Sequence, residues 1–505
     1  MDASVADAMP GPGCEDGCPM GEICLPAPLG GRCAPNCSDR DSCSGSNLVC
    51  SPVEIDSDED GSADLVQAAC VDANFDGRFL ASWCVDGDDC ESRACVRRTC
   101  TEICDDDTDC LPGMTCMEVT YPGIEGGLYR GCWYANAASR VAVEEVELGE
   151  LTLPSGRPSS RLIFAAPSNA TSVTIVAEQI SPASWSSFAF DEVYSPEERT
   201  LFDLGEMLDY RDQIIRWLPT TPDGAAAMLI PNTTPDRYRF RYGRHSFRAI
   251  AFREDGGDTT ARIFARIRRS TSGAPSDRML DLNIFLVGIG VTAANAPRNA
   301  RLQSALSELQ RIYAVRGITV DDIAYYDVSS AAASRLAVID SASGADSELS
   351  QLFQLSEGRS GNAINLFLVR EITTSSDGMT LGIAGGIPGP PGVHGSPHSG
   401  VAVSFDASVV GADPDRIAQI MAHEMGHFMG LFHVREIDRP CEPGEVPSAS
   451  VDCAPFGGED VLSDTTRDSG DNLMWPTIGG ADGRTYNVSL SEGQGSVLFN
   501  CSLTH

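Results

Sequence analysis

HEMGHFMGLFH, residues 423–433, is the stretch on which the fold of the C-terminal part of this chain depends. In a helix, His423 and His427 are one turn apart on the same face, so their imidazole nitrogens can bind one metal ion. Gly430 can take the positive φ that ends a helix, and the resulting turn returns His433 as a third ligand. Three protein ligands leave a fourth position for water, which is typical of catalytic zinc sites.

Glu424 directly follows the first histidine, so it lies beside the metal position and is not a ligand. A carboxylate there can take a proton from a zinc-bound water and act as the general base. The alternative is a helix with surface histidines. Three of the seven histidines of the chain fall in this one stretch, which favours a metal site.

Residues 423–433 match HExxHxxGxxH, the signature of the metzincin metalloproteases, and the chain resembles the pappalysin family in particular. Met474, in DNLMWP, stands where metzincins carry the methionine of the Met-turn, an apolar floor beneath the histidines. Residues 457–466 (GGEDVLSDTT) are similar to the pappalysin segment before that turn, and residues 490–498 (LSEGQGSVL) to the closing helix. The resemblance covers roughly the last 230 residues.

This resemblance implies a zinc metalloendopeptidase whose α/β metzincin catalytic domain occupies residues 278–505. Two positions depart from the family. Thr466 stands where proline is usual, and Pro476 stands where several metzincins have a tyrosine that stabilises the tetrahedral intermediate. Tyr486 is a candidate substitute for that tyrosine.

Two other functions stay open at this point. One is a calcium-dependent adhesion or carbohydrate-binding protein with an inactive metal domain, and the other is a zinc hydrolase acting on non-peptide amides. The intact Glu424 argues against the former, because an inactive domain does not need the base.

The net charge of −36, from 72 acidic and 36 basic residues, disfavours nucleic acid and anionic membranes as partners. We expect a protein or peptide substrate. No run of 18 apolar residues is present, so no transmembrane helix is predicted. Residues 1–13 are predicted to be a flexible leader without the apolar stretch of a signal peptide.

Cysteines are concentrated near the N-terminus: sixteen of the 19 lie before residue 133. This density predicts a disulfide scaffold over residues 14–133, and hence a secreted or cell-surface protein. If a leader was removed, a lipid anchor at the cell surface is one form of this prediction. Two units of eight cysteines, about 14–70 and 84–132, share the spacing C-x3-C-x5-C. Eight cysteines allow 105 pairings, so the sequence leaves the connectivity open. A zinc ribbon is disfavoured because its CxxC pairs are absent.

The three remaining cysteines lie near the C-terminus. Cys441 and Cys453 enclose a short loop after His433, and we expect a disulfide between them. A bridge of this length stabilises the fold by about 3 kcal/mol in the loop-entropy model. Cys501 would then be left over; its pairing with either of the other two is the alternative.

Two acidic loops within the cysteine-rich region carry oxygen ligands at alternating positions followed by glycine, as calcium loops do. The candidate calcium ligands are Asp56, Asp58, Asp60 and Asp64 in the first loop, and Asp72, Asn74 and Asp76 in the second. Neither loop has the glutamate expected at position 12, so solvated acidic turns are the competing interpretation.

Residues 140–270 contain short β-rich runs separated by proline, glycine and aspartate, which predicts an antiparallel β-sandwich. His245 is expected on a strand face and not as a ligand. Residues 270–277 (STSGAPSD) read as a linker.

The catalytic domain is predicted to alternate strands and helices. The expected elements are strands at 281–289, 319–328 and 362–372, and helices at 300–317, 347–355 and 413–430. Asp413 and Pro414 should begin the last helix as N-cap and first residue. Residues 382–400 are too rich in glycine and proline for a regular element, and His394 and His398 in this loop are expected to be bystanders.

Residues 401–405 (VAVSF) are predicted to form an edge strand. In metzincins, the edge strand before the zinc helix pairs with an extended substrate by main-chain hydrogen bonds.

Overall fold

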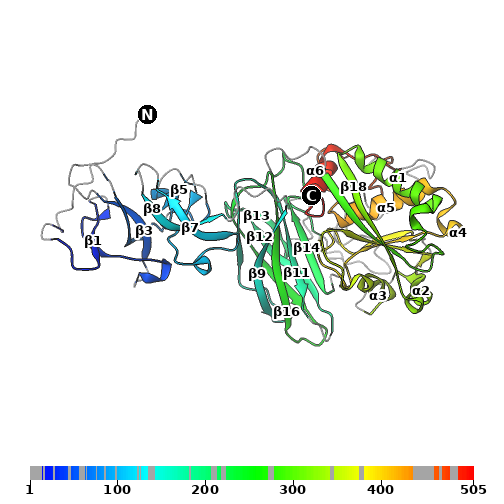
Figure 1. Cartoon of the computed structure of the whole chain (residues 1–505), viewed down its shortest axis with the longest axis horizontal. Helices are drawn as coiled ribbons and strands as arrows, with labels where there is room; N and C mark the ends of the chain where they lie inside the picture. The colour runs from blue at the N-terminus through cyan, green and yellow to red at the C-terminus, as the bar shows by residue number, and fades with distance from the viewer. Residues whose placement is uncertain are drawn as a thin grey trace.

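The computed structural model places three regions in a row: a cysteine-rich region, a β-sandwich and a C-terminal α/β region (Figure 1). We use these names for residues 14–134, 143–270 and 278–505. The structure describes residues 14, 17–26, 29–43, 47–55, 63, 65–75, 77–82, 84, 87–96, 99–121, 124, 127–134, 143–180, 184–205, 213–217, 223–270, 278–341, 346–374, 380–435, 460–465, 469–477 and 487–505. Within these ranges, no helix has the length and apolar character needed to cross a membrane.

The cysteine-rich region consists of four short antiparallel hairpins. They are β1 (Glu22–Cys24) with β2 (Cys33–Pro35), β3 (Leu48–Ile55) with β4 (Leu65–Asp72), β5 (Cys95–Val96) with β6 (Thr99–Cys100), and β7 (Met114–Thr120) with β8 (Leu128–Tyr134). Little apolar surface can be buried between such short strands, so this region depends on cross-links for its stability.

Eight disulfides divide this region into four modules of four cysteines. In each module the first cysteine pairs with the third and the second with the fourth. The pairs are Cys14–Cys24 and Cys18–Cys33, Cys37–Cys50 and Cys43–Cys70, Cys84–Cys95 and Cys90–Cys100, and Cys104–Cys116 and Cys110–Cys132. The repeating unit in the structure thus has four cysteines, whereas cysteine spacing alone indicated eight. Each predicted eight-cysteine unit, 14–70 and 84–132, contains two of these modules, and none of the eight disulfides joins the two units.

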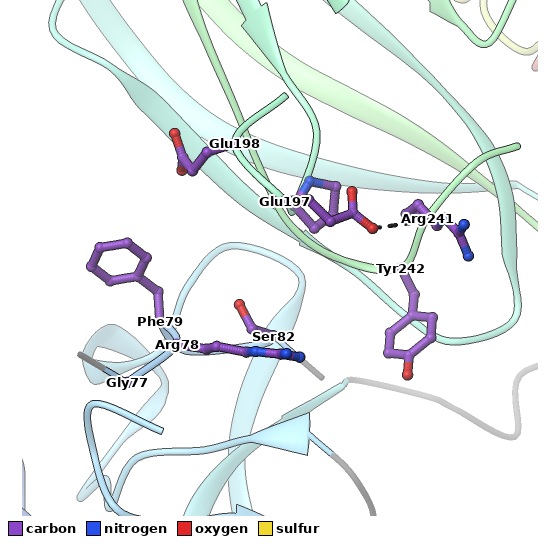
Figure 2. Close-up of a pocket in the computed structure, with 9 residues that line it drawn as sticks. Gly77, Arg78, Phe79, Ser82, Glu197, Glu198, Arg241 and Tyr242 are labelled. Atoms are coloured by element: carbon purple, nitrogen blue, oxygen red, sulfur yellow. Dashed lines mark ion pairs between the residues drawn. The ribbon is translucent and has the colours of Figure 1, made fainter. Parts of the chain in front are cut away.

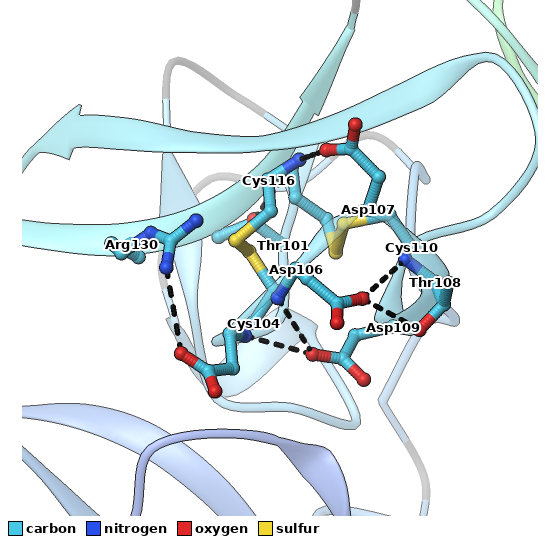
Figure 3. Close-up of a disulfide and its surroundings, with 11 residues drawn as sticks. Thr101, Cys104, Asp106, Asp107, Thr108, Asp109, Cys110, Cys116 and Arg130 are labelled. Carbon is cyan, nitrogen blue, oxygen red and sulfur yellow. Dashed lines mark hydrogen bonds and ion pairs between the residues drawn. A yellow bond between two sulfur atoms is a disulfide. The ribbon is translucent and has the colours of Figure 1, made fainter.

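The acidic loop between Cys104 and Cys110 is held by its own carboxylates (Figure 3). The side chain of Asp109 accepts the backbone N–H groups of Asp105 and Asp106 at 2.7 and 3.2 Å. These contacts form a capping box around a short 3-10 helix, and the matching loop of the second module has the same box. The aspartates here satisfy backbone donors that a tight turn leaves unpaired.

The β-sandwich is made of two four-stranded antiparallel sheets, in the orders β10-β15-β12-β13 and β14-β11-β16-β9. The strands are β9 (Val143–Leu153), β10 (Leu162–Ala166), β11 (Ala170–Gln179), β12 (Ser187–Tyr194), β13 (Thr200–Asp203), β14 (Ala225–Ile230), β15 (Gly243–Phe252) and β16 (Thr259–Arg269). Side chains from both sheets share one apolar core, as the strand pattern predicts.

His245 lies on β15 in that core, as expected for a residue on a strand face. Its ring stacks on Phe164 and Phe240, and its Nε2 lies 2.7 Å from the carbonyl of Arg241. Burial lowers the pKa of His245 to about 4, so the ring is neutral and serves packing.

The cysteine-rich region packs against the β-sandwich through its last modules. The N–H of Ala165 on β10 donates to the carbonyl of Pro112 at 2.8 Å, and Leu80 packs in the same small cluster. Beside this contact lies a cavity of about 750 Å³ between the two regions (Figure 2). An exposed Phe79 lines one wall and the Glu197–Arg241 ion pair the other.

The α/β region contains a five-stranded sheet in the order β18-β17-β20-β23-β22. Its strands are β17 (Arg278–Leu286), β18 (Ile318–Asp327), β20 (Ile364–Val369), β22 (Gly382–Ala384) and β23 (Val401–Ser404). A separate pair is formed by β19 (Val338–Asp340) and β21 (Glu371–Thr373). Four strands of the main sheet are parallel, and β22 is antiparallel to β23.

Helices cover both faces of this sheet. Helices α1 (Ala300–Ala314), α5 (Pro414–Phe428) and α6 (Glu492–Asn500) share a core with one face, and α3 (Glu348–Phe353) and the end of α2 (Ser330–Leu336) with the other. The short α4 (Ala407–Val410) precedes α5. The strands and helices expected from periodicity are present, and each agrees with its prediction to within a few residues at the ends.

The prediction for residues 382–405 is wrong in two respects. β23 is not an edge strand, because it lies between β20 and β22. The edge is β22, a regular element inside the segment that looked too rich in glycine. Gly382 is required there, because a Cβ would come within 2.5 Å of the Glu424 side chain.

Candidate metal centre

Helix α5 presents the HExxH residues, and local sequence sets its start. The side chain of Asp413 accepts the N–H of Asp415 at 3.1 Å, and Pro414 is the first helical residue, as predicted. The buried face of α5 packs on α1, where the Tyr313 hydroxyl donates to the Ala422 carbonyl at 2.8 Å. This contact fixes the helix one residue before the first histidine.

The chain turns sharply after α5. Gly430 has a φ of +106°, a backbone angle that residues other than glycine rarely adopt. The prediction that this glycine takes a positive φ and ends the helix is therefore confirmed. Its N–H donates to the carbonyl of His427 at 2.8 Å, and the N–H of Leu431 donates to that of Gly426 at 2.9 Å. These two bonds satisfy carbonyls at the helix end and direct the chain back toward His433.

The structure brings His423, His427 and His433 together. Nε2 of His433 lies 3.2 Å from Nε2 of His423 and 3.1 Å from Nε2 of His427. A tetrahedral metal with nitrogen ligands at about 2.0–2.1 Å separates those nitrogens by about 3.3 Å. The spacing therefore fits three ligands of one metal ion.

Hydrogen bonds also set the tautomers of the two helix histidines. Nδ1 of His423 lies 2.7 Å from the carbonyl of Leu473, and Nδ1 of His427 lies 2.7 Å from that of Leu431. A carbonyl can only accept, so both Nδ1 atoms carry protons and both Nε2 atoms have free lone pairs. Burial lowers the pKa of His423 to about 3 and that of His427 well below its usual value, which keeps both rings neutral, as metal ligands must be.

Glu424 lies beside this cluster at the sheet edge. The backbone N–H of Ala384 on β22 donates to its carboxylate, while burial raises the pKa of Glu424 to about 8. Glu424 and two of the histidines, His423 and His433, keep partial access to solvent, whereas His427 is 7% exposed. The cluster thus faces a solvent-accessible space with a carboxylate at its margin.

Met474 is fully buried and packs against α5. A Cβ on Gly426 would lie 2.9 Å from the Met474 sulfur, so only glycine lets the helix sit this close. The carbonyl of Met474 accepts the N–H of Val434 at 3.1 Å. This segment therefore supports the histidines from below and contacts the residue after His433.

Sequence patterns did not point to the amide pair that holds the Met474 segment. Asn472 and Gln494 on α6 exchange side-chain hydrogen bonds of 2.9 and 3.0 Å. Asn472 also accepts the N–H of Met474 at 2.8 Å. An Asn in the turn and a Gln at the third position of a capped helix were visible in the sequence, but nothing there indicated that they pair.

The described part of the GGEDVLSDTT stretch connects the third histidine with α6. The N–H of Asp460 donates to the carbonyl of His433 at 2.7 Å. The carboxylate of Asp464 accepts the N–H of Gly493 at 2.7 Å and the hydroxyl of Ser491 at 3.0 Å at the start of α6. The two aspartates of this stretch thus have separate structural roles.

Other histidines flagged by the sequence are bound to the protein itself. Both ring nitrogens of His394 have partners, the amide of Asn365 at 2.9 Å and the carbonyl of Gly361 at 3.1 Å. Nδ1 of His398 lies 2.6 Å from the carbonyl of Gly385. These contacts agree with a structural role for both rings.

Several predicted residues lie outside the described part of the chain. They are Asp56, Asp58, Asp60, Asp64, Asp76, Cys441, Cys453, Thr466 and Tyr486. Of the calcium candidates that are described, Asp72 forms an ion pair of 2.8 Å with Arg32, and the amide of Asn74 donates to the carbonyl of Asp88 at 2.5 Å. Calcium binding by these loops stays a prediction.

Cys501 is buried and is the free cysteine among the described residues. Burial raises the pKa of its thiol to about 11, so the group is protonated and packs as a small apolar side chain.

Comparison with known proteins gives only distant likenesses. No protein-family model matches the chain, and no curated protein sequence is similar to it. The solved structures that are similar to parts of this chain include three of low sequence identity. Metalloproteinase-II from Bacteroides fragilis is 13% identical, with a TM-score of 0.24 over 67% of this chain and 86% of that one. Xylanase 10C from Cellvibrio japonicus is 11% identical, with a TM-score of 0.15 over 44% of this chain and 40% of that one. The VP2 subviral particle of infectious bursal disease virus is 12% identical, with a TM-score of 0.18 over 47% of this chain and 70% of that one. Scores this low assign no family, so the functional argument rests on the metal centre.

Proposed function

We propose that this chain is a secreted zinc-dependent endopeptidase of the metzincin type, resembling the pappalysins. The observation that supports this most strongly is the convergence of three imidazoles, with Nε2 of His433 3.1–3.2 Å from Nε2 of each of the other two and Glu424 beside them. An all-nitrogen set of three is typical of catalytic zinc with one open position. The Met474 floor and the turn at Gly430 add the other two features of the metzincin signature.

In the proposed mechanism, His423, His427 and His433 would hold the metal through neutral imidazole rings. Zinc, when bound, would polarise the scissile carbonyl and lower the pKa of a water molecule. Glu424 would take a proton from the attacking water and return it to the leaving amine. Its pKa of about 8 lies in the range where a carboxyl group can both accept and release a proton near neutral pH.

The edge strand β22 is the proposed docking site for the substrate main chain. Its inner side pairs with β23, and its Ala384 N–H meets Glu424 on the other side. An extended peptide added along this edge would lie next to Glu424, which adjoins the first of the three histidines in the chain. Main-chain hydrogen bonds of this kind give affinity without restricting side chains, which suits an endopeptidase.

An oxidising environment is the expected location of the chain. Eight disulfides cross-link the described residues between Cys14 and Cys132, and such density occurs in exported proteins and not in reduced cytoplasm. We therefore place the proposed activity outside the cell or at its surface.

Metal removal tests the proposed activity. Incubation with a peptide library should yield cleavage products, and 1,10-phenanthroline should reduce cleavage to background, because the polarising cation is lost. Adding back Zn²⁺ alone should restore the activity, with Ca²⁺ alone as the control. Cleavage that survives the chelator, or that returns with calcium alone, would contradict the proposal.

Deletion of residues 1–133 should weaken the cleavage of large substrates and leave the cleavage of short peptides intact. The cysteine-rich region lies at the far end of the molecule from α5, across the β-sandwich (Figure 1), and supplies none of the metal-centre residues described above. The truncated chain should keep its kcat/KM on short fluorogenic peptides and lose it on folded proteins immobilised on beads. Thermal unfolding checks that the β-sandwich stays intact. Equal losses on both substrates would sink this idea.

A further inference from the structure

The β-sandwich is joined to the α/β region by buried contacts at the C-terminal end of the chain. The hydroxyl of Ser172 donates to the carbonyl of Asn500 at 2.6 Å. The guanidinium of Arg268, 1% exposed, donates to the carbonyl of Phe499 at 2.6 Å and to the hydroxyl of Thr504 at 2.8 Å. A buried cation in this position would be costly without these partners, so the two regions are built to stay together.

A second contact lies directly behind the proposed metal centre. Leu229 on β14 belongs to the same apolar core as Met425, Met429 and Met474. Its Cδ2 atom lies 3.1 Å from the position of a Cβ on Gly430. The sandwich therefore packs on the turn that redirects the chain from α5 to His433.

Arg216 extends this contact to the third histidine. It is 5% exposed, and its backbone is held on both sides by the Asn232 amide, which accepts its N–H at 2.9 Å and donates to its carbonyl. The guanidinium carbon lies 5.8 Å from the centre of the Phe432 ring. Burial raises the pKa of the Asp460 carboxyl, and the charge of Arg216 opposes a small part of that rise.

Phe432 and Asp460 both adjoin the backbone of His433. Phe432 precedes it in sequence, and the N–H of Asp460 donates to its carbonyl at 2.7 Å. His423 and His427 are fixed by the hydrogen bonds of α5, whereas His433 follows a turn and depends on contacts with other elements. Arg216 belongs to the β-sandwich. Its guanidinium faces the Phe432 ring, and its charge affects the pKa of the Asp460 carboxyl.

We infer that the β-sandwich is an integral part of the metal centre, and that its Arg216 is a positioning residue for His433. This inference rests on the proposed function for the role of the three histidines as ligands. Groups that orient metal ligands typically change metal affinity by 10–100-fold when they are removed. A buried cation facing the ring of Phe432, which is 4% exposed, provides an orienting force that acts on His433 through its neighbour in the chain.

The test compares zinc affinity and coordination in the full chain and its Arg216 variants. Competition with a chromogenic chelator gives the Kd for Zn²⁺, and the visible spectrum of the Co²⁺-loaded protein reports ligand geometry. Arg216→Met should weaken zinc binding by about 10–100-fold and alter the Co²⁺ spectrum. Arg216→Lys, which keeps the charge, should recover part of the affinity. Arg157→Met, at an exposed arginine of the same sandwich, is the matched control and should leave both readouts unchanged.

Phe432→Leu keeps the test decisive if Arg216→Met does not fold, because it removes the ring that faces the guanidinium and retains an apolar side chain. We expect the same direction of change in zinc affinity, and less than additive effects when the two substitutions are combined. Wild-type affinity in both Arg216→Lys and Phe432→Leu, or an unchanged affinity in a folded Arg216→Met, would overturn the inference. A wild-type chain that binds no zinc would instead overturn the proposed function.

Discussion

Replacing Glu424 with glutamine is expected to lower kcat by about 10²–10⁴-fold, the usual contribution of a general base. The substitution preserves the size and shape of the side chain and removes its ability to accept a proton. Zinc content should stay near one ion per chain, because the three histidines are unchanged. The loss should appear in kcat and in kcat/KM to the same degree, since the missing interaction is made only in the transition state.

The surroundings of Glu424 favour a clean outcome for this substitution. The amide oxygen of glutamine can still accept the N–H of Ala384, so the edge strand keeps its contact with α5. The amide also has no charge to desolvate, and burial already raises the pKa of Glu424 to about 8. Stability should therefore be unchanged or slightly higher. Turnover and metal content are measured on the same preparations, with Glu118→Gln, at an exposed glutamate of the cysteine-rich region, as the control. Wild-type turnover by Glu424→Gln would remove the basis for the protease assignment.

The helix that carries the site could be predicted closely, because its limits are local. Asp413 and Pro414 start it, and Gly430 turns the chain after it. Each of these residues acts within one helical turn of its own position, so its effect can be read from neighbouring letters of the sequence. The same holds for the buried strands β17 and β20, whose apolar runs need no knowledge of their partners.

The sheet edge could not be predicted, because it depends on pairing between distant segments. β22 has three residues, and only its register with β23 makes it a strand. The disulfide pairing could not be predicted for a related reason. The eight cysteines of one predicted unit allow 105 pairings, and their spacing in the sequence does not identify the correct one. The Asn472–Gln494 pair and the position of Arg216 also depend on tertiary contacts alone.

One residue carried a signal that sequence reasoning could have used. Gly426 stands within the last turn of α5, and a glycine inside a helix destabilises it by up to about 1 kcal/mol relative to alanine. A glycine retained at that cost indicates a close approach by another group. The structure identifies the group as the sulfur of Met474. The same reasoning applies to Gly389, where a Cβ would come within 2.0 Å of the Phe428 ring, and it explains why the loop before β23 is so rich in glycine.

Replacing His427 with alanine is expected to abolish both metal binding and activity, in contrast to Glu424→Gln. His427 is the most buried of the three histidines, and its Nδ1–H is held by the Leu431 carbonyl, so its Nε2 is the most firmly fixed donor of the set. Two remaining imidazoles leave an incomplete set for a catalytic zinc site. Alanine supplies no nitrogen at this buried position, so turnover should fall to background.

Zinc-dependent stability separates loss of the metal from loss of the fold in this variant. A ligand that binds only the folded state stabilises it by about 4 kcal/mol at a free concentration of 1,000 times its Kd. Added Zn²⁺ should therefore raise the Tm of the wild-type chain and of Glu424→Gln by several degrees, and leave the Tm of His427→Ala unchanged. His505→Ala, at a partly exposed histidine near the C-terminus, should behave like the wild type. Stoichiometric zinc or a zinc-dependent rise in Tm for His427→Ala would show that the three nitrogens seen together in the structure are not the ligand set.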